Sequence, residues 1–154
     1  MSKQPQRVVA SNRRATHDFF IEEKVEAGMV LTGSEVKSLR YGRASINESY
    51  ASEENGELYL INSHFSEYGP ASRFGHDPKR PRKLLVHKRE MDRLFGKVRR
   101  DGYTLVPLSI YFNERGLAKL SLGVAKGKRK QDKREDIKKR DWQRQKARLL
   151  REKG

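Results

Sequence analysis

Apolar and polar residues alternate in two neighbouring stretches of the chain's second half. Apolar side chains take every second position across residues 108–112, and the pattern recurs across residues 118–124. A period of two places the apolar side chains of a strand on one face. Asn113 and Gly116 lie in the connection, where a hairpin needs turn residues. The pattern therefore predicts a β-hairpin over residues 104–125.

A helical period replaces this alternation in two other stretches. Thr32 followed by Glu35 forms a capping box, and Gly42 ends the short helix that the box begins. Across residues 87–100, apolar side chains recur at positions i, i+3, i+4 and i+7, until Gly102 stops the pattern. We therefore predict two helices, each with one buried face.

The remaining apolar stretches predict further strands. Residues 19–31 have a strand pattern in which Gly28 marks a bend or bulge. Residues 46–52 and 57–65 flank an Asn-Gly dipeptide, the strongest short hairpin signal. About six strands and two helices result, without the repeated strand-helix-strand order of a parallel sheet. The predicted fold class is mainly β with flanking helices: a small antiparallel β-barrel of the OB type over residues 17–125.

The two ends of the chain lack such periodicity. Residues 1–16 are polar and basic, and we expect a flexible arm there. In the C-terminal tail, residues 126–154, apolar residues are too few to offset an ordering entropy of about 1 to 2 kcal/mol per backbone residue. We expect the tail to be disordered when free and helical when bound, since Asp132 and Glu135 can cap a helix. The apolar residues of the tail are Ile137, Trp142, Ala147, Leu149 and Leu150.

Charge indicates the class of partner. The chain carries 35 Lys or Arg against 20 Asp or Glu, a net charge of +15. This excess is more than solubility requires and favours a polyanion, most simply nucleic acid. Basic residues gather in three runs, at residues 13–14, 79–83 and 126–134, and the second run lies in a long loop over residues 66–83. Contacts between such runs and phosphates position a nucleic acid without specifying its sequence.

Composition also narrows the compartment. The chain has no cysteine, which suits a reducing cytosol. Its first residues lack the apolar run of a signal peptide, and no segment approaches the length needed to span a bilayer. The basic segments lack the broad apolar face of an interfacial helix. We expect a soluble, cytoplasmic protein with no membrane partner.

Residue constellations typical of enzymes are missing from the sequence. The four histidines are scattered without short ligand spacing, so we expect no metal and no cofactor. His76 and Asp77 could form a general base beside RNA, but a turn at Asp77 before Pro78 is the simpler interpretation. Glu26 could be an acid catalyst, although an acceptor for a base edge or a residue at a bend suits it better. We therefore predict no enzymatic activity.

The sequence discriminates among three classes of function. A general single-strand-binding module would present outward aromatic side chains, whose stacking contributes about 1 to 3 kcal/mol per base. The Tyr and Phe residues of this chain mostly take core-facing positions, which favours recognition of a folded RNA by its shape. An RNA-processing enzyme would need the catalytic cluster that the sequence lacks. A shape-reading RNA-binding protein is the leading hypothesis.

Six segments, taken in order along the chain, carry a family resemblance. They are NRRA at residues 12–15, EAG at 26–28, SEVKSLRYG at 34–42, HDPKRPRKLL at 76–85, GYTLVPLSIYF at 102–112 and KGKRKQDKR at 126–134. Together they closely resemble the SmpB family, the SsrA-binding proteins. The resemblance covers almost the whole chain and weakens after Arg134.

The resemblance implies a function as well as a fold. It implies an OB-type barrel with a C-terminal tail that is unstructured in the free protein. Proteins of that family bind the tRNA-like domain of tmRNA and take it, with EF-Tu, to ribosomes stalled on messages that lack a stop codon. The resemblance thus implies a monomeric, cytoplasmic protein of trans-translation whose tail occupies the empty mRNA channel at the decoding centre.

The resemblance also implies site residues. In the body it assigns RNA contacts to Asn12, Glu26 and Leu85, and in the tail it singles out Asp132, Lys133 and Arg134. Charge adds phosphate or sugar contacts to this set. The added residues are Arg13, Arg14, Lys37, Arg80, Arg82 and Lys83 in the body, and Lys126, Lys128, Arg129 and Lys130 in the tail.

Overall fold

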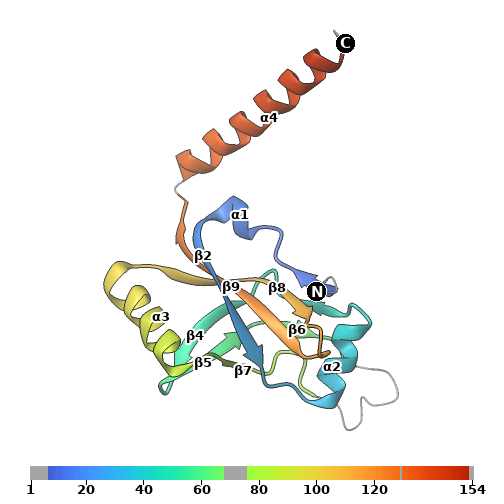
Figure 1. Cartoon of the computed structure of the whole chain (residues 1–154), viewed down its shortest axis with the longest axis vertical. Coiled ribbons are helices and arrows are strands. Elements are labelled where there is room, and N and C mark those ends of the chain that lie inside the picture. The colour runs from blue at the N-terminus through green and yellow to red at the C-terminus, as the bar shows by residue number, and fades with distance from the viewer. Residues whose placement is uncertain (1–6, 68–75, 129, 153–154) are drawn as a thin grey trace.

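The computed structural model describes residues 7–67, 76–128 and 130–152, and its main element is one antiparallel sheet of seven strands (Figure 1). In spatial order the strands are β1 (Arg7–Ser11), β8 (Thr104–Phe112), β9 (Ala118–Gly127), β2 (Phe19–Met29), β7 (Arg82–Leu85), β5 (Glu57–Ile61) and β4 (Tyr50–Glu54). A separate two-stranded sheet pairs β3 (Ala44–Ser45) with β6 (His64–Phe65).

Helices flank the sheet in the described part of the chain. They are α1 (Ala15–Asp18), α2 (Gly33–Arg40), α3 (Lys88–Asp101) and α4 (Lys130–Glu152). In Figure 1, α2 and α3 lie at opposite ends of the curled sheet, while α4 projects away from the body. The predicted fold class, mainly β with flanking helices, is confirmed.

The sheet curls without closing. β4 approaches β8, but β1 and β4 are the two edges of the sheet, and no hydrogen-bonded ladder joins these edges in the described residues. A closed barrel would leave neither edge unpaired. The barrel predicted from the sequence is therefore an open one.

The turn residues in the sequence correctly predicted the positions of both hairpins. Asn55 and Gly56, between β4 and β5, have φ angles of 54° and 79°, the left-handed pair that a two-residue type I′ turn requires. Gly116, with φ of 75°, ends the turn between β8 and β9. Register in each hairpin follows from these short turns, and it decides which side chains share a face.

Both predicted helices are present. The Thr32 hydroxyl accepts the Glu35 backbone N–H, and the Glu35 carboxylate accepts the Thr32 N–H in return, which completes the capping box of α2. α3 ends at Gly102 in the left-handed conformation, with φ of 71°. Leu94 and Phe95 are buried, so the helical period located the packed face of α3 correctly.

The N-terminal segment is ordered where a flexible arm was predicted. Residues 7–11 form β1 and pair with β8, and Ala15 of α1 is buried. The prediction of a flexible arm over residues 1–16 is therefore wrong from Arg7 onward. A short edge strand satisfies its backbone hydrogen bonds by pairing and needs no long apolar pattern. Residues 1–6 lie outside the described residues.

β2 is continuous at Gly28, where a bend or bulge was predicted. The strand pairs with β9 up to Gly28 and with β7 from Gly28 onward. Its bulge lies near its start, between Ile21 and Glu23. Gly28 marks a close approach instead, because a Cβ atom there would lie 3.3 Å from the Leu85 Cβ.

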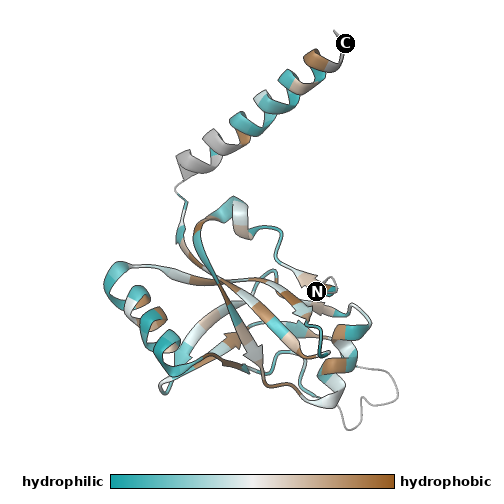
Figure 2. Ribbon diagram, viewed as in Figure 1, coloured by the Kyte–Doolittle hydropathy of each residue, from teal (hydrophilic) through white to brown (hydrophobic). Residues whose placement is uncertain are grey.

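The boundary between body and tail also shifts. β9 runs to Gly127, where it pairs with Phe19, so residues 126–127 belong to the sheet. α4 begins at Lys130, its described side chains are exposed, and Figure 2 shows mostly hydrophilic colours along it. Most helices in proteins are stabilised by tertiary packing of one face. The described side chains of α4 are exposed and do not pack against the body in this way. Disorder of the free tail stays a prediction.

The core lies on the inner face of the curled sheet. Ile110, Leu120 and Leu122 are fully buried there, together with Leu58 and Leu60 of β5. On the outer face, α1 covers a smaller apolar cluster at one end of β8 and β9. Beyond that cluster, the outer face carries polar side chains of β2, β8 and β9.

Candidate nucleic-acid interface

Strand register brings two of the predicted RNA contacts together on the outer face. Ser121 of β9 lies opposite Glu26 of β2, and two positions along the same face Lys119 lies opposite Gly28. Gly28 pairs on its other side with Leu85 of β7. Because residues two apart on a strand share a face, Glu26, Lys119 and Leu85 converge around the side-chain-free Gly28.

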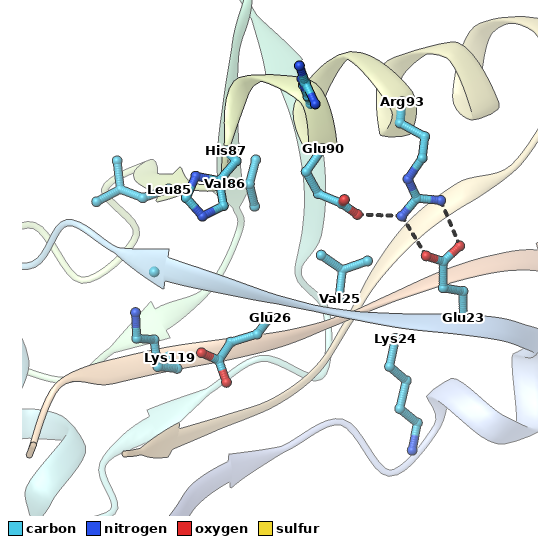
Figure 3. Close-up of a pocket in the computed structure, with 12 residues that line it drawn as sticks. Glu23, Lys24, Val25, Glu26, Leu85, Val86, His87, Glu90, Arg93 and Lys119 are labelled. Carbon is cyan, nitrogen blue, oxygen red and sulfur yellow. Dashed lines mark hydrogen bonds and ion pairs between the residues drawn. The ribbon is translucent and has the colours of Figure 1, made fainter. Parts of the chain in front are cut away.

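These residues line an open groove of about 880 Å³ (Figure 3). In Figure 3, Glu26 and Lys119 lie on one side of β2, with Leu85 and the start of α3 beyond it. The groove is lined by Glu23, Lys24, Val25, Glu26, Gly28, Leu85, Val86, His87, Arg89, Glu90, Arg93 and Lys119. It therefore combines cations, a carboxylate acceptor and an apolar side chain.

Leu85 supplies the exposed apolar surface of the groove, with 51% of its area exposed. His87, the N-cap of α3, is exposed and lies near Leu85 in Figure 3. Arg89, in the first turn of α3, is also exposed and lines the same groove. An unstacked nucleotide needs an apolar surface for its base or ribose and cations for its phosphate. This part of the groove offers both.

Glu26 has its own partner on the sheet. The Tyr111 hydroxyl, from β8, donates to Oε2 of Glu26. Burial of the Tyr111 ring, together with this hydrogen bond to a carboxylate, raises the pKa of the phenol. The hydroxyl therefore keeps its proton at neutral pH and remains a donor to Glu26.

Ion pairs fix α3 against the other end of the groove. Arg93 of α3 donates to both carboxylate oxygens of Glu23 on β2 and to Glu90 one turn earlier (Figure 3). The hydrogen bond from Arg93 lowers the pKa of the Glu23 carboxyl. The hydrogen bonds to Glu23 and Glu90 in turn raise the pKa of Arg93. These pairs are partly exposed and contribute orientation more than stability.

Arg82 is buried, which contradicts its predicted contact with phosphate. Its side chain has no exposed area, and Nε donates to Oε2 of Glu35 at 2.5 Å. Its other nitrogens donate to the hydroxyl of Ser63 and to backbone carbonyls, and the guanidinium lies 3.9 Å from the centroid of the Phe65 ring. Every side of the guanidinium is engaged by the protein, so the prediction for Arg82 is wrong.

Arg80 and Lys83 also have protein partners, although both are partly exposed. Arg80 Nη2 donates to Oε1 of Glu35 at 2.5 Å, and Lys83 Nζ donates to Glu57 at 2.9 Å. The Lys83–Glu57 hydrogen bond raises the pKa of the lysine and lowers that of the glutamate. Contacts from Arg80 and Lys83 to RNA stay a prediction.

The structure supports the interpretation that the sequence favoured at His76 and Asp77, a turn rather than a general base. His76 is buried, with Nε2 donating to the Phe65 carbonyl at 2.7 Å and Nδ1 lying 2.9 Å from the Ser34 hydroxyl. Asp77 forms the predicted turn, because its carboxylate accepts the Lys79 N–H at 3.0 Å. Tyr68, Arg73 and Phe74 of the same loop lie outside the described residues.

Asn12 lies away from the groove, at a second cavity of about 150 Å³ that Arg14 also lines. Its Nδ2 donates to the Pro107 carbonyl at 3.0 Å, which ties the β1–α1 connection to β8. Its Oδ1 is buried and has no hydrogen-bond partner among the described residues. Asn12 therefore has a structural hydrogen bond, and its predicted contact with RNA stays open to test.

Three further basic predictions concern exposed positions. Arg13 and Arg14 lie in the turn before α1, and Lys37 lies on α2. All three are exposed. Their side chains can reach an anion without any change in the fold, so their contacts with phosphate stay a prediction.

The described residues contain neither a cluster of metal ligands nor a membrane-spanning helix. No group of three or more potential ligands from His, Asp and Glu gathers there. None of the helices in that part of the chain has the length and apolar character to cross a membrane.

Comparison with known proteins decides the family. A family model described as "SmpB protein" matches residues 9–152. The chain belongs to the SmpB family. The chain is 62% identical over 146 residues to an SsrA-binding protein of Moorella thermoacetica, a match that covers 95% of this chain and 94% of the relative. An SsrA-binding protein of Bradyrhizobium diazoefficiens is 56% identical over 153 residues, covering 99% and 98% of the two chains.

A solved structure extends the comparison. The chain matches one from work described as "tmRNA-SmpB: a journey to the center of the bacterial ribosome", with a TM-score of 0.65 and 53% identity over 82% of this chain and 92% of that one. The family predicted from the six sequence segments is thus confirmed. SmpB proteins are an RNA-binding family by these names, which agrees with the charge of this chain.

The residues predicted as tail contacts lie partly on the body and partly in α4. Lys126 Nζ lies 4.7 Å from the centroid of the Tyr103 ring. Lys128 Nζ lies 4.8 Å from that of Phe20 and donates to the Thr16 carbonyl at 2.8 Å. Both lysines therefore contact the body, at the root of the tail, which is the point where the chain leaves the sheet for α4. Lys130, Asp132, Lys133 and Arg134 fall in the first turns of α4, and Arg129 lies outside the described residues.

Sequence reasoning missed several groove residues in this SmpB chain. Lys119 alternates with core residues of the hairpin, so the register of β9 could have placed it beside Glu26. Tyr111, which does not line the groove but donates to Glu26, entered the sequence prediction only as part of the same alternation. Arg89 belongs to no basic run of the kind that the charge pattern singled out.

Proposed function

We propose that this chain binds the tRNA-like domain of tmRNA through its β body and carries that RNA to stalled ribosomes for trans-translation. Membership of the SmpB family supports the RNA partner, and relatives named SsrA-binding protein support its identity. The observation that carries the proposal is the convergence of Glu26, Leu85 and Lys119 in one groove. Two of these residues, Glu26 and Leu85, were predicted as RNA contacts from separate parts of the sequence.

The groove suits an unpaired or exposed nucleotide within a folded RNA. Leu85 packs against a base or ribose, Lys119 and Arg89 attract phosphate, and Glu26 accepts a hydrogen bond from a base edge or a ribose hydroxyl. A carboxylate repels phosphate, so Glu26 selects the orientation in which the nucleotide presents a donor. Shape and donor position, rather than charge alone, then set specificity.

The rest of the chain serves the second partner, the ribosome. We assign the exposed basic helix α4 to the empty mRNA channel, because a cationic segment with few apolar residues orders most readily against ribosomal RNA. Arrival with EF-Tu through tmRNA, action as a monomer and a cytoplasmic location complete the proposal. The chain contributes binding and positioning in this scheme and no catalytic step.

A competition titration tests the RNA partner. Purified full-length chain is titrated against labelled tmRNA at near-physiological salt, with excess bulk tRNA or poly-U as competitor. Binding that survives both competitors supports recognition of the tRNA-like fold of tmRNA. If bulk tRNA and poly-U each abolish binding to the same extent, the proposal is contradicted. The chain would then be a general cationic RNA-binding module.

A further inference from the structure

Tyr111 and Glu26 lie on strands that are not neighbours. β9 separates β8 from β2, and the Tyr111 hydroxyl reaches across it to the Glu26 carboxylate. The residue opposite Glu26 on β9 is Ser121, whose short side chain leaves room on the outer face for the phenol. Tyr111 itself is buried, with 7% of its area exposed, so its ring cannot swing freely.

The carboxylate would otherwise be poorly positioned. Glu26 is an exposed residue on the outer face of a sheet, and a glutamate side chain has several rotatable bonds whose ordering costs free energy on binding. Oε2 is held by Tyr111, which leaves Oε1 as the acceptor for a ligand in the groove beside Leu85 and Lys119. The rigid β8 strand thus fixes the geometry of a flexible side chain.

We propose that Tyr111 is a positioning residue, which presents Oε1 of Glu26 as a preoriented acceptor for a ribose hydroxyl or base amine of the bound RNA. This inference rests on the proposed function. It adds a residue that does not touch the RNA itself. It also adds a chemical requirement on the nucleotide, which must offer a hydrogen-bond donor at this point of the groove.

The chain offers a matched control. Tyr103 donates to Oε2 of Glu22 at 2.6 Å, so it forms the same kind of phenol–carboxylate pair, in an exposed position. Glu22 does not line the groove. Tyr103→Phe therefore removes the same hydroxyl chemistry outside the groove.

The test is a double-mutant cycle of tmRNA affinity in the full-length chain, using Tyr111→Phe, Glu26→Ala and both together. We expect Tyr111→Phe to weaken binding about tenfold, with an unchanged salt slope because no phosphate contact is lost. In the Glu26→Ala background the same change has no further effect, and Tyr103→Phe has none at all. Thermal melts of each variant establish that the fold is kept.

The outcomes separate this inference from the proposed function. The positioning role is wrong if the Tyr111→Phe variant binds tmRNA as tightly as the parent chain. It is also wrong if Tyr111→Phe lowers tmRNA affinity by the same factor with and without Glu26. In both cases the proposed binding of tmRNA is unaffected. If the parent chain itself shows no preference for tmRNA over bulk tRNA, the proposed function fails and the inference falls with it.

Discussion

Arg82 and Glu35 form an ion pair in which both side chains are fully buried, with 2.5 Å between Nε and Oε2. Arg82 begins β7 and Glu35 lies in the first turn of α2, so the pair joins the helix to the sheet. Glu35 also caps α2 through the Thr32 N–H and accepts from Arg80. One carboxylate therefore fixes the helix, the strand and the turn that leads into the strand.

Replacing Arg82 should destabilise the body strongly. Arg82→Leu leaves the buried Glu35 without its fully buried partner, and breaking a buried pair in this way typically costs about 3 to 5 kcal/mol. Urea denaturation measures the free energy of unfolding. Lys83→Met serves as the control, because the neighbouring Lys83–Glu57 pair is partly exposed. A loss for Arg82→Leu no larger than that of the control would contradict the structural role of the pair.

The same pair predicts acid sensitivity. Burial raises the pKa of the Glu35 carboxyl, but hydrogen bonds from Arg80 and the Thr32 backbone and the charge of Arg82 outweigh it, so the folded-state pKa is lowered. A lowered pKa means that the unfolded chain binds the proton more tightly. The stabilisation that ionised Glu35 contributes is therefore complete above its unfolded-state pKa of about 4.3. This stabilisation is lost as the pH falls through the folded-state pKa of Glu35.

Denaturation between pH 7 and pH 3 measures this dependence. Stability should fall below about pH 4, and Glu35→Gln should flatten that part of the profile while lowering stability at pH 7. An identical acid profile for the parent chain and Glu35→Gln would mean that other carboxyls account for the loss.

Gly28 should matter for RNA binding more than for folding. A Cβ atom there would lie 3.3 Å from the Leu85 Cβ and 3.7 Å from the Lys119 Nζ, so Gly28→Ala crowds the floor of the groove. We expect tmRNA affinity to fall about tenfold, with a small change in melting temperature. Gly33→Ala is the control, because nothing lies within 4 Å of a Cβ at that position. Equal affinities for the two variants would exclude Gly28 from the binding surface.

Lys128 should control how the tail leaves the body. Its backbone N–H donates to the Asp18 carbonyl at 2.8 Å, and its side chain reaches Thr16 and the face of Phe20. Lys128→Met removes the side-chain contacts. We expect faster hydrogen exchange at the Lys128 amide, unchanged tmRNA affinity and weaker tagging on ribosomes. Weaker tagging with unchanged exchange would instead indicate a direct contact between Lys128 and ribosomal RNA.

Signals within a few residues predicted the local structure well. The Asn55-Gly56 turn, the Thr32–Glu35 capping box and the stop at Gly102 each require a particular backbone conformation, and the structure adopts all three. Closure of the barrel could not be predicted in the same way, because it depends on pairing between strands far apart in the sequence.

Charge runs were the less reliable guide to the site. Arg82 belongs to the basic run at residues 79–83, yet it is buried against a glutamate that lies far earlier in the sequence. Composition cannot reveal such a partner. The Tyr111–Glu26 hydrogen bond was missed for the same reason, since it depends on the register of two hairpin strands against a third.

The most direct test of the central claim separates the body from the tail. A chain truncated after Lys128 keeps the whole sheet and the contacts at the root of the tail. Its affinity for tmRNA and its ability to support tagging on stalled ribosomes are measured beside the full-length chain. We predict an affinity close to that of the full chain and abolished tagging. Loss of tmRNA affinity by orders of magnitude would contradict the division of labour between body and tail.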